Sequence, residues 1–159
     1  LVAKSTASGS DRRLYAAAAK GAGRSDAAQA AQRARAPSPQ ALAAQLAEAD
    51  TAMKAGNWAN ASALYKGLLA VTDGTNPLVL NNLALAESRL GREQEGLAFA
   101  LRALESAPEN ASVMDTAGWL LVETDTDHAR GLRLLEAAAK KAPGNATIAG
   151  HLAAARKGT

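Results

Sequence analysis

One pattern of helix, turn and helix recurs along this chain at a spacing of about 34 residues. Its clearest copy begins at Pro77, has a turn at Gly91 and ends at Pro108. Proline cannot continue a helix, so Pro108 marks the end of the second helix. Such repeats contact mainly their neighbours, and their stability is roughly a sum over neighbouring interfaces. The spacing therefore predicts a stack of helical hairpins.

The composition agrees with an all-helical chain. Alanine supplies 42 of the 159 residues. It has the highest helix propensity, and its small side chain lets helices pack closely. Valine, isoleucine and threonine, which favour strands, are sparse. We therefore expect an all-α fold, a right-handed α-α superhelix of hairpins closed by a C-terminal capping helix.

Charge and cysteine content narrow the classes of partner. The net charge of +3 divides into +5 over residues 1–40, −7 over 41–129 and +5 over 130–159. Because the basic residues lie at the two ends and form no continuous stripe, nucleic acid is not expected as a partner. The chain has no cysteine, which excludes disulfides and thiolate metal sites. No apolar run approaches the roughly 18 residues of a membrane-spanning helix.

The repeats can be placed along the chain by their turn residues. Residues 1–41 hold a degenerate repeat, complete repeats follow, and the last segment forms the cap; the predicted boundaries are 42–76, 77–110, 111–145 and 146–159. The turn at 124–128 has one residue more than the pattern expects, and Asp125 or Asp127 can cap the helix after it. Asn145 is expected to cap the last helix, with Ile148 facing inward and His151 outward.

No catalytic grouping emerges from the sequence. His128 and His151 lie 23 positions apart without metal-ligand spacing, and both are expected on the solvated surface. Asp125 and Asp127 lack the rest of a calcium loop, and no phosphate loop or nucleophile elbow is present. The prediction is a protein that is no enzyme and that uses no cofactor or metal.

The repeat resembles the tetratricopeptide repeat. The copy from Pro77 matches that pattern at its turn, its proline stop and its small or apolar positions, namely Leu83, Ala84, Gly91, Gly96, Ala100, Ala103 and Pro108. Small residues stand where the two helices of a hairpin cross closely. The resemblance implies a non-catalytic scaffold that binds a protein or peptide partner in a concave groove formed by the first helix of each repeat.

Carried over position by position, the resemblance predicts the partner-binding residues Asp50, Met53, Lys54, Leu78, Asn81, Asn82, Leu85, Arg89, Asp115, Trp119 and Glu123. Asn81 and Asn82 lie mid-helix although asparagine is a poor helix former. Their amides can bond the backbone of an extended peptide; a local helix-start turn or a hydrogen bond between repeats explains them equally well. Trp119 is either an aromatic platform in the groove or a packing residue, and Trp58 is expected to pack between repeats.

The sequence can be compared directly with the binding motif of one subfamily. Co-chaperone tetratricopeptide domains grip a terminal carboxylate with lysine and asparagine at fixed groove positions. Asn82 matches one of these, but Leu46 and Ser112 occupy the lysine positions and Thr116 the arginine position. A chaperone tail ending in a carboxylate is therefore not expected as the ligand.

The last repeat has a narrower resemblance. Residues 114–121, 130–138, 142–145 and 151–153 are similar to the last repeat of bacterial tetratricopeptide lipoproteins that accompany exopolysaccharide export and protein sorting. This implies a bacterial envelope assembly, with a periplasmic or outer-membrane-associated location favoured over the cytoplasm. Two alternatives stay open: the repeat region of a larger enzyme that recruits its substrate, and a scaffold that self-associates through its basic ends and acidic middle.

Overall fold

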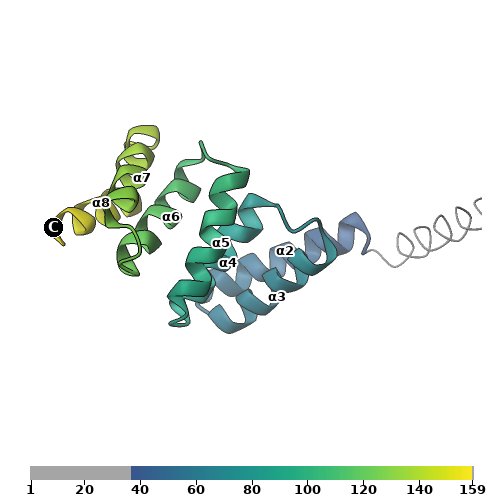
Figure 1. Ribbon diagram of the computed structural model, residues 1–159. Coiled ribbons are helices and arrows are strands. Elements are labelled where there is room, and N and C mark those ends of the chain that lie inside the picture. The colour runs from purple at the N-terminus through teal and green to yellow at the C-terminus, as the bar shows by residue number, and fades with distance from the viewer. Residues whose placement is uncertain (1–36, 159) are drawn as a thin grey trace, which may run out of the picture. The chain divides into compact units, whose positions relative to one another are not determined.

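The computed structural model describes residues 37–158, and the degenerate repeat expected within 1–41 lies almost wholly outside them. The described part belongs to one compact unit that begins at Ser38. It contains seven helices and no strand (Figure 1): α2 Pro39–Lys54, α3 Trp58–Val71, α4 Pro77–Arg89, α5 Glu93–Ser106, α6 Ala111–Glu123, α7 His128–Lys141 and α8 Ala146–Lys157.

Consecutive helices pack as hairpins. The pairs α2–α3, α4–α5 and α6–α7 make the most extensive contacts, and each hairpin packs against the next. Helices α4 and α6, the first helices of two adjacent hairpins, contact each other, and α6 also contacts α8. The predicted all-α superhelix of helical repeats is thereby confirmed.

Short polar side chains begin most of these helices. Asn57, Asn76, Asn110, Asp127 and Asn145 each accept a backbone N–H from the first turn of the following helix, as does Ser38 ahead of α2. Such caps satisfy N–H groups that have no partner within the helix. The cap expected from Asn145 is confirmed, and of the two aspartates expected as candidates for capping α7, Asp127 is the one that does so.

The first described helix starts earlier than the predicted repeat boundary. Helix α2 begins at Pro39, three residues before Leu42. A proline suits the first helical position because its missing N–H would have no helical partner there. Pro39 therefore begins a helix, in contrast to Pro108, which follows the end of α5.

The turns follow the glycines of the pattern. Gly56, Gly74 and Gly91 have φ values of 70°, 70° and 74°, in the left-handed region that glycine adopts without a steric cost. The irregular turn at 124–128 uses a different residue, because Asp125 takes φ 51° there. Aspartate is among the few other residue types that tolerate this conformation.

Glycines also allow the helices of a hairpin to cross closely. A Cβ added to Gly96 of α5 would lie 2.8 Å from the carbonyl oxygen of Ala84 on α4. In the next hairpin Gly118 of α6 and Gly131 of α7 face each other: an added Cβ on Gly131 would lie 2.6 Å from the Gly118 oxygen, and one on Gly118 2.9 Å from the Gly131 oxygen. The sequence pattern singled out Gly96 and Gly118 as small positions, but not Gly131.

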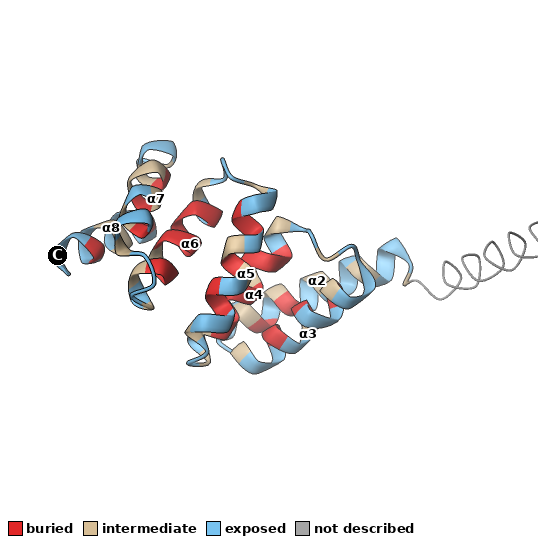
Figure 2. Ribbon diagram, viewed as in Figure 1, coloured by how far each residue is buried: buried red, intermediate tan, exposed pale blue. Residues whose placement is uncertain are grey.

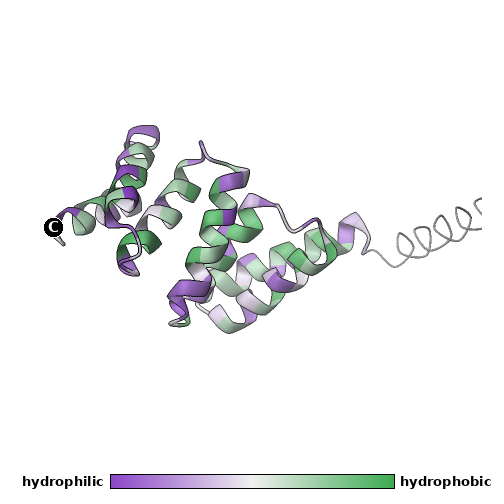
Figure 3. Cartoon of the chain, in the orientation of Figure 1, coloured by the Kyte–Doolittle hydropathy of each residue, from purple (hydrophilic) through white to green (hydrophobic). Residues whose placement is uncertain are grey.

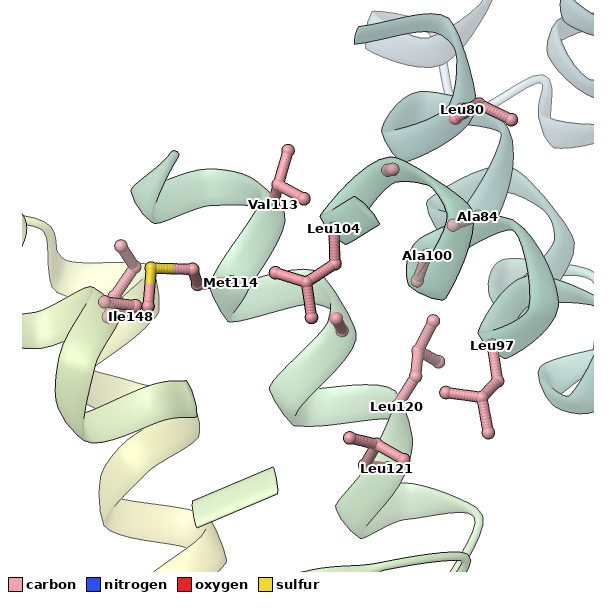
Figure 4. Packing of buried hydrophobic residues seen from close by; sticks show 13 residues of the cluster. Leu80, Ala84, Leu97, Ala100, Leu104, Val113, Met114, Leu120, Leu121 and Ile148 are labelled. Carbon is pink, nitrogen blue, oxygen red and sulfur yellow. The ribbon is translucent and has the colours of Figure 1, made fainter. Parts of the chain in front are cut away.

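The buried core consists of two hydrophobic clusters along the stack. Figure 2 shows the buried residues concentrated where the helices meet. The larger cluster extends from α4 to α8 and includes Leu80, Leu104, Met114, Leu120 and Ile148 (Figure 4). A second cluster joins α2, α3 and α4 around the fully buried Tyr65. Leucine burial at each interface supplies about 1.5–3 kcal/mol per side chain.

One buried charge ties three helices together. Glu87 of α4 is fully buried. Its carboxylate lies 2.7 Å from Lys66 Nζ on α3 and 2.6 Å from Arg92 Nε before α5, and it accepts a hydrogen bond from Ser62. Burial raises the pKa of Glu87, but the hydrogen bonds from Lys66 and Ser62 and the charges of Lys66 and Arg92 outweigh it and lower that pKa. The carboxylate is therefore held in its ionised form.

Apolar and polar residues interleave along the helices (Figure 3). Each helix thus buries one face and exposes the other. Within the described residues, no helix combines the length and the apolar character needed to span a membrane.

Candidate functional site: a groove along the first helices

A groove of about 480 Å³ runs across α4 and α6, with contributions from α2, α3 and α8. Seven of the predicted binding residues line it: Met53, Leu78, Asn81, Asn82, Leu85, Arg89 and Asp115. The remaining lining residues are Trp58, Ser112, Thr116, Asn145, Thr147, Ile148 and His151. The structure thus brings together, on one surface, residues from three successive hairpin units and the cap.

Four predicted residues lie elsewhere. Asp50 accepts a hydrogen bond from the Tyr65 hydroxyl at 2.6 Å, and Lys54 is exposed at the end of α2. Glu123 is exposed and accepts a hydrogen bond from Ser88 at 3.4 Å. Trp119 is half-buried. None of the four belongs to the groove lining, and their predicted role in binding stays a prediction.

The two neighbouring asparagines have different surroundings. Asn82 donates from Nδ2 to the Tyr65 hydroxyl at 3.1 Å, which links α4 to α3. Burial and the hydrogen bond to Asp50 raise the pKa of Tyr65 above its ordinary value, so its hydroxyl stays protonated in this chain. For Asn82, the structure therefore supports the second explanation given above, a hydrogen bond between neighbouring repeats.

Asn81 has no such partner. Asn81 is 6% exposed and lines the groove, and its Oδ1 is buried without a hydrogen bond. A buried polar group without a partner costs about 1–3 kcal/mol. An incoming ligand that pairs with this amide would recover part of that cost, which is the property expected of a binding residue.

A second cluster lies at the α6–α8 junction, where the carboxylate of Asp115 contacts His151 and the ring of His151 stacks on Trp119. Asp115 is 6% exposed, and both of its carboxylate oxygens lie 3.0 Å from His151 Nδ1. The His151 ring also stacks on the Trp119 ring, with the two centroids 4.7 Å apart and the ring planes inclined by 16°. The contact attaches the capping helix to α6.

The position of His151 corrects a sequence prediction. We expected His151 on the outward face of the cap, but it is half-buried and lines the groove. The capping helix packs against α6 as well as α7, and this second contact turns the His151 face inward. The spacing between Asp115 and His151 in the sequence carries no signal of the contact.

Trp58 contacts the neighbouring repeat, as expected, and it also lines the groove. It is the first residue of α3. The Arg89 guanidinium lies 6.0 Å from the centroid of its ring, within the range of a cation–π contact. Arg89 and Trp58 therefore form a cationic, aromatic end of the groove.

These features define two ends of the groove. Asn81 precedes Arg89 by eight residues on α4, and Asp115 precedes Glu123 by eight on α6. Eight residues of helix span about 12 Å. Since Ser88 contacts Glu123, the C-terminal ends of α4 and α6 are neighbours, and Asn81 and Asp115 lie at the opposite end from Arg89. We call these the Asp115 end and the Arg89 end.

The residues at the carboxylate-gripping positions are not cationic. Thr116 is buried and donates to the Ser112 carbonyl oxygen, whereas Ser112 is exposed in the groove. Leu46 is half-buried in a separate, mostly apolar pocket between α2, α3 and α4. Among the described residues that line the groove, Arg89 is the sole lysine or arginine.

Neither His128 nor the basic residues near the C-terminal end belong to the lining of the groove. His128 is half-buried at the start of α7 with Nε2 unpaired, which differs from the solvated position expected. Over residues 37–158, no group of three or more histidine, aspartate or glutamate side chains could hold a metal ion. Lys141 pairs with Glu109, and Arg156 pairs with Glu136.

Known structures share this fold. The tetratricopeptide domain of Sgt2 from Aspergillus fumigatus is 19% identical, with a TM-score of 0.66 over 77% of this chain and 80% of that domain. The first such domain of Spaghetti (RPAP3), bound to an HSP90 peptide, is 15% identical, with a TM-score of 0.67 over 78% and 97%. The TPR2B domain of yeast Sti1, in complex with Hsp70, is 18% identical, with a TM-score of 0.64 over 74% and 98%.

Sequence comparison adds no nearer relative. No protein-family model matches the chain, and no curated protein sequence matches it. At 15–19% identity the structural likeness establishes the fold, which is that of tetratricopeptide repeat domains.

Proposed function

We propose that this protein is a non-catalytic scaffold that binds an extended peptide or a protein segment in the groove across α4 and α6. The observation that carries the proposal is Asn81, a buried amide with an unpaired oxygen in the wall of a groove whose lining combines apolar residues, such as Met53 and Leu85, with polar and charged ones. Apolar surface combined with placed polar groups is typical of binding sites. Two of the similar domains, those of Spaghetti and Sti1, were solved with HSP90 and Hsp70 ligands, which supports peptide binding as the mode of action.

The test is a selection from a random peptide library, followed by titration of the selected peptides. Trp58 in the groove gives an intrinsic fluorescence signal. Asn81→Ala should weaken binding about threefold to tenfold, the scale of one hydrogen bond to a buried group. Asn60→Ala is the matched control, because Asn60 is exposed on α3 outside the groove lining and its loss should leave affinity unchanged. Equal affinities for all three proteins would rule out the groove as the binding site.

We also propose a bacterial envelope setting, in an assembly or export complex, on the basis of the resemblance of the last repeat to bacterial tetratricopeptide lipoproteins. Fractionation of cells that carry the tagged full-length gene product tests it. Recovery with the envelope fraction is expected, and recovery in the cytosol alone would contradict this setting.

Self-association is the alternative that the charge distribution favours. Residues 41–129 carry −7 and residues 130–159 carry +5, so one copy could present its basic end to the acidic middle of another. Light scattering at rising salt tests this, because screening shortens to about 3 Å at 1 M salt. A monomer at every salt concentration would eliminate it.

A further inference from the structure

The Asp115 end of the groove holds a buried carboxylate and a buried amide oxygen without a hydrogen-bond partner. An ionised carboxylate offers about four acceptor sites on its two oxygens. Asp115 is met there by one ring nitrogen, His151 Nδ1, which is 3.0 Å from each oxygen. Asn81, on the neighbouring helix at the same end, adds an amide whose oxygen has no partner. A ligand that donates hydrogen bonds would complete both groups.

The Arg89 end has the opposite character. The Arg89 side chain is exposed and lies beside Trp58. Among the described residues that line the groove, no other is a lysine or arginine. Arg89 forms no salt bridge among the described residues. An exposed guanidinium without a carboxylate partner is suited to an acidic group on a ligand.

We infer that the groove selects a peptide segment that places a lysine or arginine side chain against Asp115 and an acidic side chain against Arg89. Arg89 lies on α4 and Asp115 on α6. About 12 Å along the helices combined with about 8–10 Å between packed helix axes separates them by about 15 Å, which an extended chain covers in four or five residues at about 3.3 Å each. This inference deepens the proposed function and rests on it. It sets the ligand apart from a tail recognised by its terminal carboxylate, for which the groove has no lysine.

Complementary charge mainly determines specificity in such contacts. The test therefore compares pairs of substitutions. Peptides selected from the random library are synthesised with their basic residue as lysine or as norleucine, which keeps the chain length and removes the charge. Each is titrated against the wild-type protein, Asp115→Asn and Glu105→Gln by tryptophan fluorescence. Glu105 is exposed on α5 outside the groove lining, so Glu105→Gln removes one negative charge elsewhere.

Norleucine should weaken binding to the wild-type protein and to Glu105→Gln about tenfold, and binding to Asp115→Asn less than about twofold. Arg89→Ala should weaken the binding of peptides that carry the acidic residue about threefold to tenfold. It should leave the affinity of versions that carry glutamine at that position unchanged. Because Arg89 is exposed, this variant tests the proposal even if Asp115→Asn loosens α8, which circular dichroism would detect.

The outcomes separate the two proposals. Selected peptides without an excess of basic residues, or an equal effect of norleucine in the wild type and in Asp115→Asn, would overturn the charge assignment. If those peptides still lose affinity with Asn81→Ala, the groove remains the binding site. Failure to select any peptide would overturn both proposals.

Discussion

At the scale of single residues, the backbone conformation of the turns determines which substitutions the fold tolerates. Gly91 lies at φ 74°, and an added Cβ there would meet no atom within 4 Å. The cost of a side chain at this position is therefore a matter of backbone strain and not of crowding.

Gly91→Ala should lower the free energy of unfolding by about 1 kcal/mol, because alanine is strained at positive φ. Gly144→Ala is the control, since Gly144 also has open space but no positive φ, and it should change the free energy by less than about 0.5 kcal/mol. Urea unfolding monitored by circular dichroism measures both. Equal effects of the two substitutions would show that the Gly91 turn is not strained by a side chain.

At the scale of helices, close crossings and buried charge determine how the hairpins fit together. The crossing of α6 and α7 depends on Gly118 and Gly131, which bring the two backbones into direct contact. The packing of α3, α4 and the start of α5 centres on Glu87.

Gly131→Ala should destabilise the protein by about 2 kcal/mol or more, because the new Cβ would lie 2.6 Å from a backbone oxygen and 2.7 Å from Val122. Gly150→Ala, in open space on α8, should instead stabilise by about 0.5–1 kcal/mol through helix propensity. The two melting temperatures give the comparison. A Gly131→Ala protein as stable as Gly150→Ala would disprove the close crossing.

The stability that Glu87 supplies should depend on pH. Its pKa is lowered from an ordinary value of 4.5, so the stabilisation is complete above about pH 4.5 and is lost as pH falls through the lowered pKa of the folded state. Glu87→Gln removes the negative charge. Because Lys66 and Arg92 are each about half-exposed and water screens their charges, the substitution should lower the free energy of unfolding by only about 1–2 kcal/mol at neutral pH. Urea unfolding at several pH values should show the two proteins converging in acid. A constant difference down to pH 3 would contradict the ion-pair account.

At the scale of the whole molecule, the repeat pattern was sufficient to predict the hairpins, and it also placed most of the groove. Gly91 and Pro108 each have a local effect on the backbone, which is why the sequence reveals the ends of α4 and α5. Asn81 and Asp115 occupy repeat positions whose orientation follows from the helix period. Their placement in the groove could therefore be anticipated.

The parts that sequence reasoning missed depend on contacts between elements. His151 faces the groove because α8 packs on α6, and a helix at the end of an array has no following repeat to indicate its inner face. Trp58 was expected only to pack between repeats, but Asn57 caps α3 and makes Trp58 its first residue, and the ring also lines the groove. Gly131 was not singled out because the extra residue in the 124–128 turn shifts the repeat register.

The central claim is that a peptide occupies the groove across α4 and α6, and chemical-shift mapping tests it most directly. An isotope-labelled protein is titrated with a selected peptide, and the shifts of the backbone amides and of the two tryptophan indoles are followed. Our account predicts the largest changes at Asn81, Leu85, Asp115 and the Trp58 indole, with α5 and α7 little affected. Changes concentrated on α5 and α7, or none at Asn81 and Asp115, would contradict it.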